Sequence, residues 1–93
     1  MILHHFQTSL CSDNAFTAAL PLIANEDYLL LSSDALYGLL NPTVQSKLVG
    51  YAVYVLAQDC EALGLTEKLS DYTALDYAGF VQLTLKSDKV ITW

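Results

Sequence analysis

Residues 51–65 read YAVYVLAQDCEALGL, and this stretch decides the fold. Its first half is an apolar run rich in β-branched valine, which predicts a buried strand over residues 51–56. Its second half has a short helical pattern over residues 58–63, closed by Gly64. In open α/β sheets, reactive groups lie just past the carboxyl ends of the strands. The junction from Leu56 to Cys60 is therefore the first place to look for one.

The rest of the chain repeats this alternation of short strands and helices. Strands are expected at residues 1–7, 28–31, 51–56, 73–75 and 89–93. The apolar spacing from Phe16 to Ile23 predicts a first helix, with a kink or an early end at Pro21. Further helices are expected over residues 35–40, 58–63 and 77–85, and one helical turn is expected at 44–48. The last helix has Tyr77, Phe80, Val81, Thr84 and Leu85 on one face. Such alternation predicts a parallel sheet with helices on both sides, in one domain spanning residues 1–93.

The composition points to an assembly. Apolar residues make up 54% of the 93-residue chain and charged residues only 15%, against about 25% in an ordinary domain. A small domain has too little interior for this apolar excess, so part of it must lie at the surface. Contiguous exposed apolar surface marks interaction sites, and we therefore expect the chain to be one subunit of a larger complex.

The charge excludes several functions. The net charge is −6, and the sequence has four lysines and no arginine. A protein that binds nucleic acid directly needs a basic patch to contact the phosphates, and an anionic membrane also attracts basic patches. This sequence lacks the residues for such a patch, so we expect it to bind neither nucleic acid nor an anionic membrane directly. No signal peptide or membrane span is apparent, so we expect a soluble cytoplasmic protein without membrane contact. Two cysteines are too few for a disulfide framework, and free thiols are typical of a reducing compartment.

The polar side chains do not form a recognisable catalytic set. His4 and His5 must point to opposite faces of a regular strand, so they cannot share a metal, and each is expected to be packed or hydrogen-bonded. Asp34, Asp59 and Asp76 follow three strands. They do not match the magnesium site of a receiver domain, and we expect them in cap or first-turn positions of helices. No metal or cofactor is therefore expected.

The two thiols remain as weak catalytic candidates. Cys60 lies about one turn into its helix, between Asp59 and Glu61, and these carboxylates disfavour the reactive thiolate. Its simpler interpretation is a small buried apolar residue. Cys11 follows the first strand, at the edge of the sheet where ligands are expected.

Four segments resemble the DsrH/TusB family of sulfur-relay proteins. They are ILHHFQTS at residues 2–9, DYLLLSSDALYGLL at 27–40, YVLAQDCEALGL at 54–65 and LDYAGFVQLTLKSDKVITW at 75–93. The resemblance implies a three-layer α/β/α fold around a five-stranded, mostly parallel sheet. It also implies a heterohexamer of two heterotrimers with DsrE/TusD-like and DsrF/TusC-like subunits. Such complexes pass persulfide sulfur to a downstream carrier, towards tRNA wobble-uridine 2-thiolation or in sulfur oxidation.

The resemblance also implies where the sulfur-carrying cysteine would be. In the DsrE/TusD subunit it ends the third strand, eight residues before a glycine, and this position is Leu56 here. Some DsrH members carry a cysteine in the first helix, where this chain has Ala18 and Ala19. We therefore predict a non-catalytic subunit serving tRNA thiolation.

Three alternatives remain at this point. The chain could be a DsrH-type subunit of a sulfur-oxidation complex, a persulfide carrier using Cys60 or Cys11, or a stand-alone ligand-binding module. Trp93, Tyr77 and Phe80 are the candidate interface residues, with ordinary core packing as the other explanation for these aromatic side chains.

Overall fold

The computed structural model describes residues 1–7, 20–24 and 26–93. Its five strands form one sheet in the order β4-β3-β2-β1-β5, and every neighbouring pair is parallel. The strands are β1 (Ile2–Phe6), β2 (Tyr28–Leu31), β3 (Ala52–Leu56), β4 (Thr73–Leu75) and β5 (Lys89–Thr92). The predicted parallel sheet is confirmed, with each strand within one or two residues of its expected bounds.

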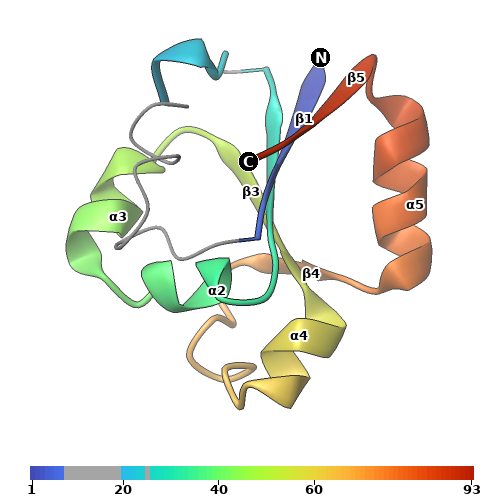
Figure 1. Cartoon of the computed structure of the whole chain (residues 1–93). Helices are drawn as coiled ribbons and strands as arrows, with labels where there is room; N and C mark the ends of the chain where they lie inside the picture. Colours follow the sequence, from blue (N-terminus) through green and yellow to red (C-terminus); the bar gives the residue numbers. More distant parts are fainter. Residues whose placement is uncertain (8–19, 25) are drawn as a thin grey trace.

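Helices cover both faces of this sheet, as predicted for a three-layer α/β/α fold (Figure 1). They are the 3-10 helix η1 (Leu20–Leu22), α2 (Ala35–Gly38), α3 (Pro42–Lys47), α4 (Ala57–Ala62) and α5 (Tyr77–Lys86). Among the described residues, side chains of α2, α3 and α4 pack on one face of the sheet, and those of α5 pack on the other. The strand order explains this division. From β1 to β4 the chain moves one way across the sheet, and then α5 carries it back to β5. Crossovers of constant hand place a returning helix on the opposite face.

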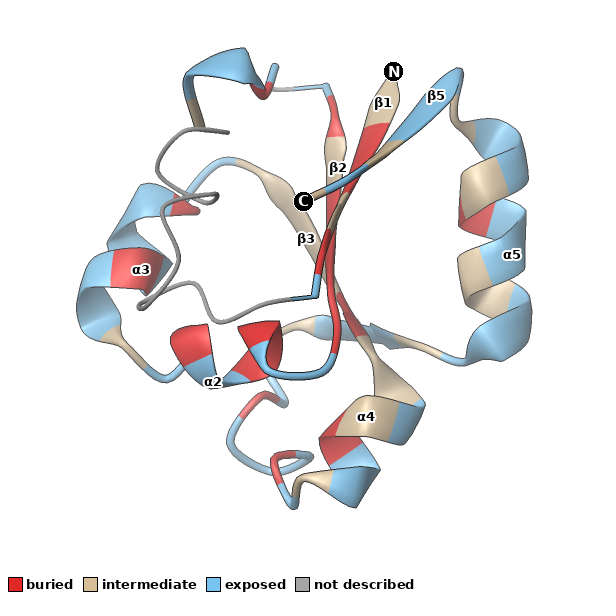
Figure 2. Cartoon of the chain, in the orientation of Figure 1, coloured by how far each residue is buried: buried red, intermediate tan, exposed pale blue. Residues whose placement is uncertain are grey.

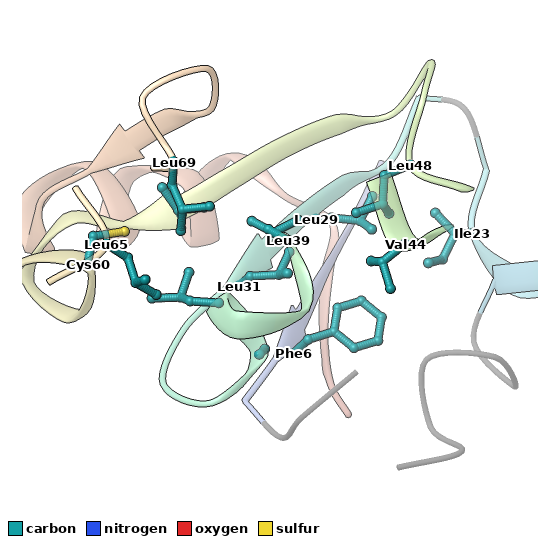
Figure 3. Packing of buried hydrophobic residues seen from close by; sticks show 13 residues of the cluster. Phe6, Ile23, Leu29, Leu31, Leu39, Val44, Leu48, Cys60, Leu65 and Leu69 are labelled. Carbon is teal, nitrogen blue, oxygen red and sulfur yellow. The ribbon is translucent and has the colours of Figure 1, made fainter. Parts of the chain in front are cut away.

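The leucines of β2 connect the two sides of the core. Leu29 and Leu31 belong to the larger apolar cluster, which packs against α2 and α3, whereas Leu30 contacts the cluster beneath α5. All three are fully buried (Figure 2). Figure 3 shows the larger cluster, with Leu29 and Leu39 near its centre. A strand covered on both faces shows a continuous apolar run, as this one does.

Local helix signals were predicted less well than strands. The helical turn expected at residues 44–48 is α3, which begins earlier, at Pro42. Asn41 caps this helix by accepting a hydrogen bond from the Thr43 N–H at 2.9 Å. Proline fits the first turn because no N–H is needed there. The preceding helix ends at Gly38 instead of residue 40. The first half of the helix expected from Phe16 to Ile23 lies outside the described residues, and Pro21 lies within η1.

The orientation of α5 shows which of its apolar side chains pack on the sheet. Tyr77, Val81 and Leu85 do share a face, but this face points outward, and these side chains are 60%, 43% and 80% exposed. Leu83 is the buried residue of the helix, and Phe80 packs partly beside it. The apolar residues Tyr77, Val81 and Leu85 of this helix therefore lie at the surface and outside the core.

A buried carboxylate links the first strand to the loop before β2. Oδ1 of Asp27 accepts the Ile2 N–H at 2.9 Å, and Oδ2 accepts the Ala24 N–H at 3.1 Å. Oδ2 also lies 3.1 Å from Nε2 of His4. Burial raises the pKa of Asp27, but the two N–H donors and the imidazole outweigh burial, so this pKa lies below its ordinary 3.8.

His4 extends this link to the C-terminal residue. The indole N–H of Trp93 donates to Nδ1 of His4 at 3.2 Å. Because an indole nitrogen only donates, the proton of the neutral imidazole is on Nε2, where it points to Asp27. The Trp93 ring also stacks on Phe6 with centroids 6.2 Å apart. His5 contacts Phe80 on the other face of the sheet, so the predicted opposite orientation of the two histidines is confirmed.

None of the helices described here has the length and apolar character needed to cross a membrane.

We predict that Asp27→Asn lowers the free energy of unfolding by about 2 kcal/mol at pH 7, because hydrogen bonds to a charged group are lost. Urea denaturation would measure the loss. The contribution of Asp27 is present above its unfolded pKa and disappears as pH falls through the lower folded pKa. The gap between wild type and variant should therefore shrink between pH 7 and pH 3.

Glu26→Gln is the matched control, since it removes an exposed carboxylate one residue away and should change stability by less than about 0.5 kcal/mol. An Asp27→Asn effect no larger than that of the control, or a gap that does not change with pH, would contradict the assignment.

Candidate functional site

The corner between β3 and α4 has the geometry of a ligand-binding edge. From β3 the chain turns to α4 on one face, and from β4 it turns to α5 on the other. Connections that leave neighbouring strands in opposite directions create the crevice where α/β proteins bind ligands. Leu56 ends β3 here and is the N-cap residue of α4, without a side-chain capping bond. An apolar side chain thus occupies the position where the resemblance placed a sulfur carrier in a partner subunit.

Cys60 lies deeper, on the inward face of α4. It is 3% exposed and lines a mostly apolar cavity of about 200 Å³ together with Val55 and Leu69. Figure 3 shows its sulfur within the larger cluster, in the region of Leu65 and Leu69. Burial raises the pKa of the thiol above its ordinary 9.0, and the carboxylates of Asp59 and Glu61 raise it further. Cys60 is therefore a protonated, shielded thiol at neutral pH.

The end of α4 explains why Cys60 faces inward. Gly64 has a positive φ of 69°, which glycine adopts without strain. The Leu65 N–H donates to the Cys60 carbonyl at 2.8 Å, and the Gly64 N–H donates to the Glu61 carbonyl at 3.2 Å. This is the Schellman arrangement, which pairs the third-last residue of a helix with the residue after the glycine through an apolar contact. Cys60 and Leu65 are both buried in the same cluster.

The three aspartates have different roles. Asp76 caps α5 by accepting the Gly79 N–H at 2.8 Å, as predicted. Asp34 is the N-cap residue of α2 but makes no capping bond, so that expectation was wrong for its side chain. Asp59 lies in the first turn of α4, yet its carboxylate accepts the N–H of Ser33 at 2.8 Å. It links two strand ends, and sequence spacing gives no signal of such a contact.

A histidine–serine pair lies at the same edge and was missed by sequence reasoning. Nε2 of His5 and Oγ of Ser32 are hydrogen-bonded at 2.8 Å. Burial lowers the pKa of His5 below its ordinary 6.5, and the nearby Asp59 carboxylate only partly opposes this, so the ring is neutral at pH 7. Ser32 is buried, so its hydroxyl is closed to a substrate and joins β1 to the end of β2.

The remaining predicted site residues do not converge on this corner. Tyr77 lies on the exposed face of α5, Phe80 is half-buried between this helix and the sheet, and Trp93 is half-buried against His4. Cys11 lies outside the described residues. Within residues 1–7, 20–24 and 26–93, no group of three or more His, Cys, Asp or Glu side chains is arranged to hold a metal ion.

The family model and the curated relatives that match this chain indicate the same family. Residues 8–90 match the family model described as DsrH like protein. Among curated proteins, the chain is 35% identical to Protein TusB of Photorhabdus laumondii, over 77% of this chain and 79% of that protein. It is 34% identical to Protein TusB of Escherichia coli O81, over 84% and 86% of the two chains.

A solved structure shares the fold. A conserved protein of unknown function from Bacteroides thetaiotaomicron superposes with a TM-score of 0.71, covering 99% of this chain and 94% of that one, at 16% sequence identity. At this identity the likeness supports the α/β fold alone.

We predict that Cys60 reacts slowly with thiol reagents in the folded chain. In Cys11→Ser, Cys60 is the sole cysteine, and its modification at pH 8 by a disulfide reagent should be at least about tenfold slower than in urea, because only the exposed thiolate reacts. Glu61→Gln is the control: burial is the larger cause of the raised pKa, so this variant should stay slow. Equal rates in the folded and unfolded chains would refute the shielding.

Proposed function

The chain belongs to the DsrH family, and from this premise we propose that it is a non-catalytic subunit of a complex that passes persulfide sulfur towards 2-thiolation of the wobble uridine in tRNA. The match to the DsrH family and the likeness to Protein TusB support a place among sulfur-relay proteins. The further proposal is that this chain shapes the complex, while the thiol chemistry belongs to a partner subunit. The single observation that carries it is the side chain at the β3–α4 corner, which is Leu56.

The state of Cys60 supports a non-catalytic role. Persulfide transfer requires a thiolate that can reach the sulfur donor, and reactive cysteines lie in partly exposed, electropositive surroundings. Cys60 is buried beside two carboxylates, and its pKa is raised. The alternative of a persulfide carrier would require Cys11 or a large movement of α4.

The surface of α5 supports the proposed assembly with DsrE/TusD-like and DsrF/TusC-like subunits. Its outer face exposes Tyr77, Val81 and Leu85, and no charged side chain lies among them. Apolar exposed surface of this kind is typical of subunit contacts. Tyr77 is the best placed of the proposed interface residues, since Phe80 and Trp93 already use much of their surface within the chain. The heterohexameric arrangement and a cytoplasmic location belong to the same proposal.

The names of the relatives favour the tRNA branch over sulfur oxidation. The curated relatives at 34–39% identity are each named Protein TusB, and in the family resemblance that name goes with tRNA thiolation. The proposal takes residues 1–93 as one DsrH/TusB-like domain, which is supported by a single sheet that joins strands from Ile2 to Thr92.

We predict that cysteine replacement in this chain leaves sulfur transfer intact. In a reconstituted complex with both partner subunits, Cys11→Ser, Cys60→Ala and the double variant should support tRNA 2-thiolation within about twofold of wild type, because a residue outside the reacting groups stabilises no transition state. Thiolated tRNA would be quantified by nucleoside mass spectrometry. Replacing the sulfur-carrying cysteine of the partner is the positive control and should abolish thiolation.

Size-exclusion chromatography of each complex separates a lost subunit from a lost reaction. Loss of thiolation in the double variant with assembly preserved would overturn the non-catalytic role. The same conclusion would follow if this chain alone gained the mass of one sulfur atom on incubation with a persulfide donor that loads the partner.

A further inference from the structure

The imidazole of His4 lies in the interior with a different partner on each ring nitrogen. Its side chain is 1% exposed. Nε2 lies 3.1 Å from a carboxylate oxygen of Asp27, and Nδ1 lies 3.2 Å from the indole nitrogen of Trp93. Because both nitrogens are engaged, any change in the protonation of this ring alters at least one of the two contacts.

A second proton on His4 would affect these two contacts in opposite ways. In the neutral ring Nε2 carries the proton, and the lone pair of Nδ1 accepts the indole N–H. The second proton therefore binds Nδ1, where it faces a group that can only donate. At Nε2 the added charge strengthens the hydrogen bond to the carboxylate of Asp27. Protonation thus keeps the Asp27 contact and breaks the one to Trp93.

The charges around His4 do not remove this conflict. Among the described residues, the ionisable side chain in contact with His4 is Asp27. Burial raises the pKa of this carboxyl, but its hydrogen bonds with Ile2, Ala24 and His4 outweigh burial and hold the pKa below 3.8. Asp27 therefore stays ionised while the histidine titrates. The other charged groups on the adjoining segments lie at the surface, namely Glu26, Asp88, Lys89 and the amino group of Met1, which is paired with Asp88 at 2.7 Å.

The side chain of Trp93 can leave its place while its backbone stays. The backbone N–H donates to the His5 carbonyl at 2.9 Å, independently of the indole. The ring is only half-buried and lies almost parallel to Phe6, with an angle of 11° between the planes. An indole N–H that loses its acceptor in a partly buried site costs free energy until it reaches water. Rotation of the side chain towards solvent is the simplest way to satisfy it.

We propose that His4 is an acid-sensitive switch that releases the indole of Trp93 from the sheet when its imidazole takes up a second proton at Nδ1. The closed arrangement requires the neutral ring, so proton binding favours the released arrangement, and release increases as the pH falls. The switch moves a large apolar side chain from the core to the surface. It does not depend on sulfur transfer, and it holds or fails independently of the proposed function.

The test uses the fluorescence of Trp93, which is the sole tryptophan of the chain. Quenching by acrylamide, a neutral molecule, would be measured on the full chain from about pH 8 to about pH 5, where a histidine is the side chain expected to titrate. The quenching constant should rise at least about twofold towards low pH, because the released ring is exposed to the quencher. Far-UV circular dichroism should stay constant over the same range, which separates release from unfolding.

Two variants identify the group that titrates. His4→Gln replaces the imidazole with an amide that can donate and accept but does not titrate, so its quenching constant should not change with pH. His5→Gln is the matched control on the same strand, since His5 lies on the opposite face of the sheet and contacts Phe80. This variant should keep the rise seen in the wild type.

NMR of the wild-type chain gives a second measurement, which holds even where His4→Gln does not fold. The ring protons of His4 and the indole N–H of Trp93 should shift with the same pH midpoint. A quenching constant that stays flat to pH 5 would overturn the proposal, as would a rise that persists in His4→Gln. Different midpoints for the two NMR signals, or a rise that coincides with loss of circular dichroism, would overturn it as well.

Discussion

The buried carboxylate of Asp27 is the interaction on which the arrangement of the sheet depends. It is 3% exposed, and a charge at such a site is tolerated only when it is fully hydrogen-bonded. Its oxygens accept the N–H groups of Ile2 and Ala24 and contact His4, whose other ring nitrogen accepts from Trp93. One acidic group therefore ties β1 to the segment before β2, and through the imidazole to Trp93. Without this carboxylate, the N–H groups of Ile2 and Ala24 and Nε2 of His4 would lose the acceptor that they share, which is why these separate segments are held together.

This scaffold separates the two ends of β3. At its carboxyl end, where α/β sheets place their reactive groups, Leu56 occupies the corner, and the turn at Gly64 directs Cys60 into the core. Burial and neighbouring carboxylates both oppose ionisation of that thiol. At its amino end the strand begins two residues before its pairing with β4, at Ala52. The reactive position of the fold is thus apolar.

Strands were predicted better than helix ends and helix faces. The apolar run at residues 28–31 predicts a strand buried on both sides, and this prediction depends on nothing beyond the run itself. Which face of α5 packs on the sheet could not be predicted from its sequence, because this depends on the elements that lie against the helix. Tyr77, Val81 and Leu85 are as apolar as core residues, and only the packing of Leu83 against Leu3 and Leu30 shows that they face outward. For the candidate site, position Leu56 was found in advance, whereas the His5–Ser32 and Ser33–Asp59 contacts were not.

Composition and local pattern were sufficient for the parallel sheet, the apolar excess and the cap at Asp76, because each depends on residues close in sequence or on totals. The family followed from the resemblance of four segments to known proteins. The partners of Asp27 and the depth of Cys60 emerged from the folded chain. These features depend on strand register and on helix placement, which bring together residues as distant as His4 and Trp93. A one-residue shift of register would turn every side chain of a strand to the other face, so such contacts belong to the whole fold and to no single segment.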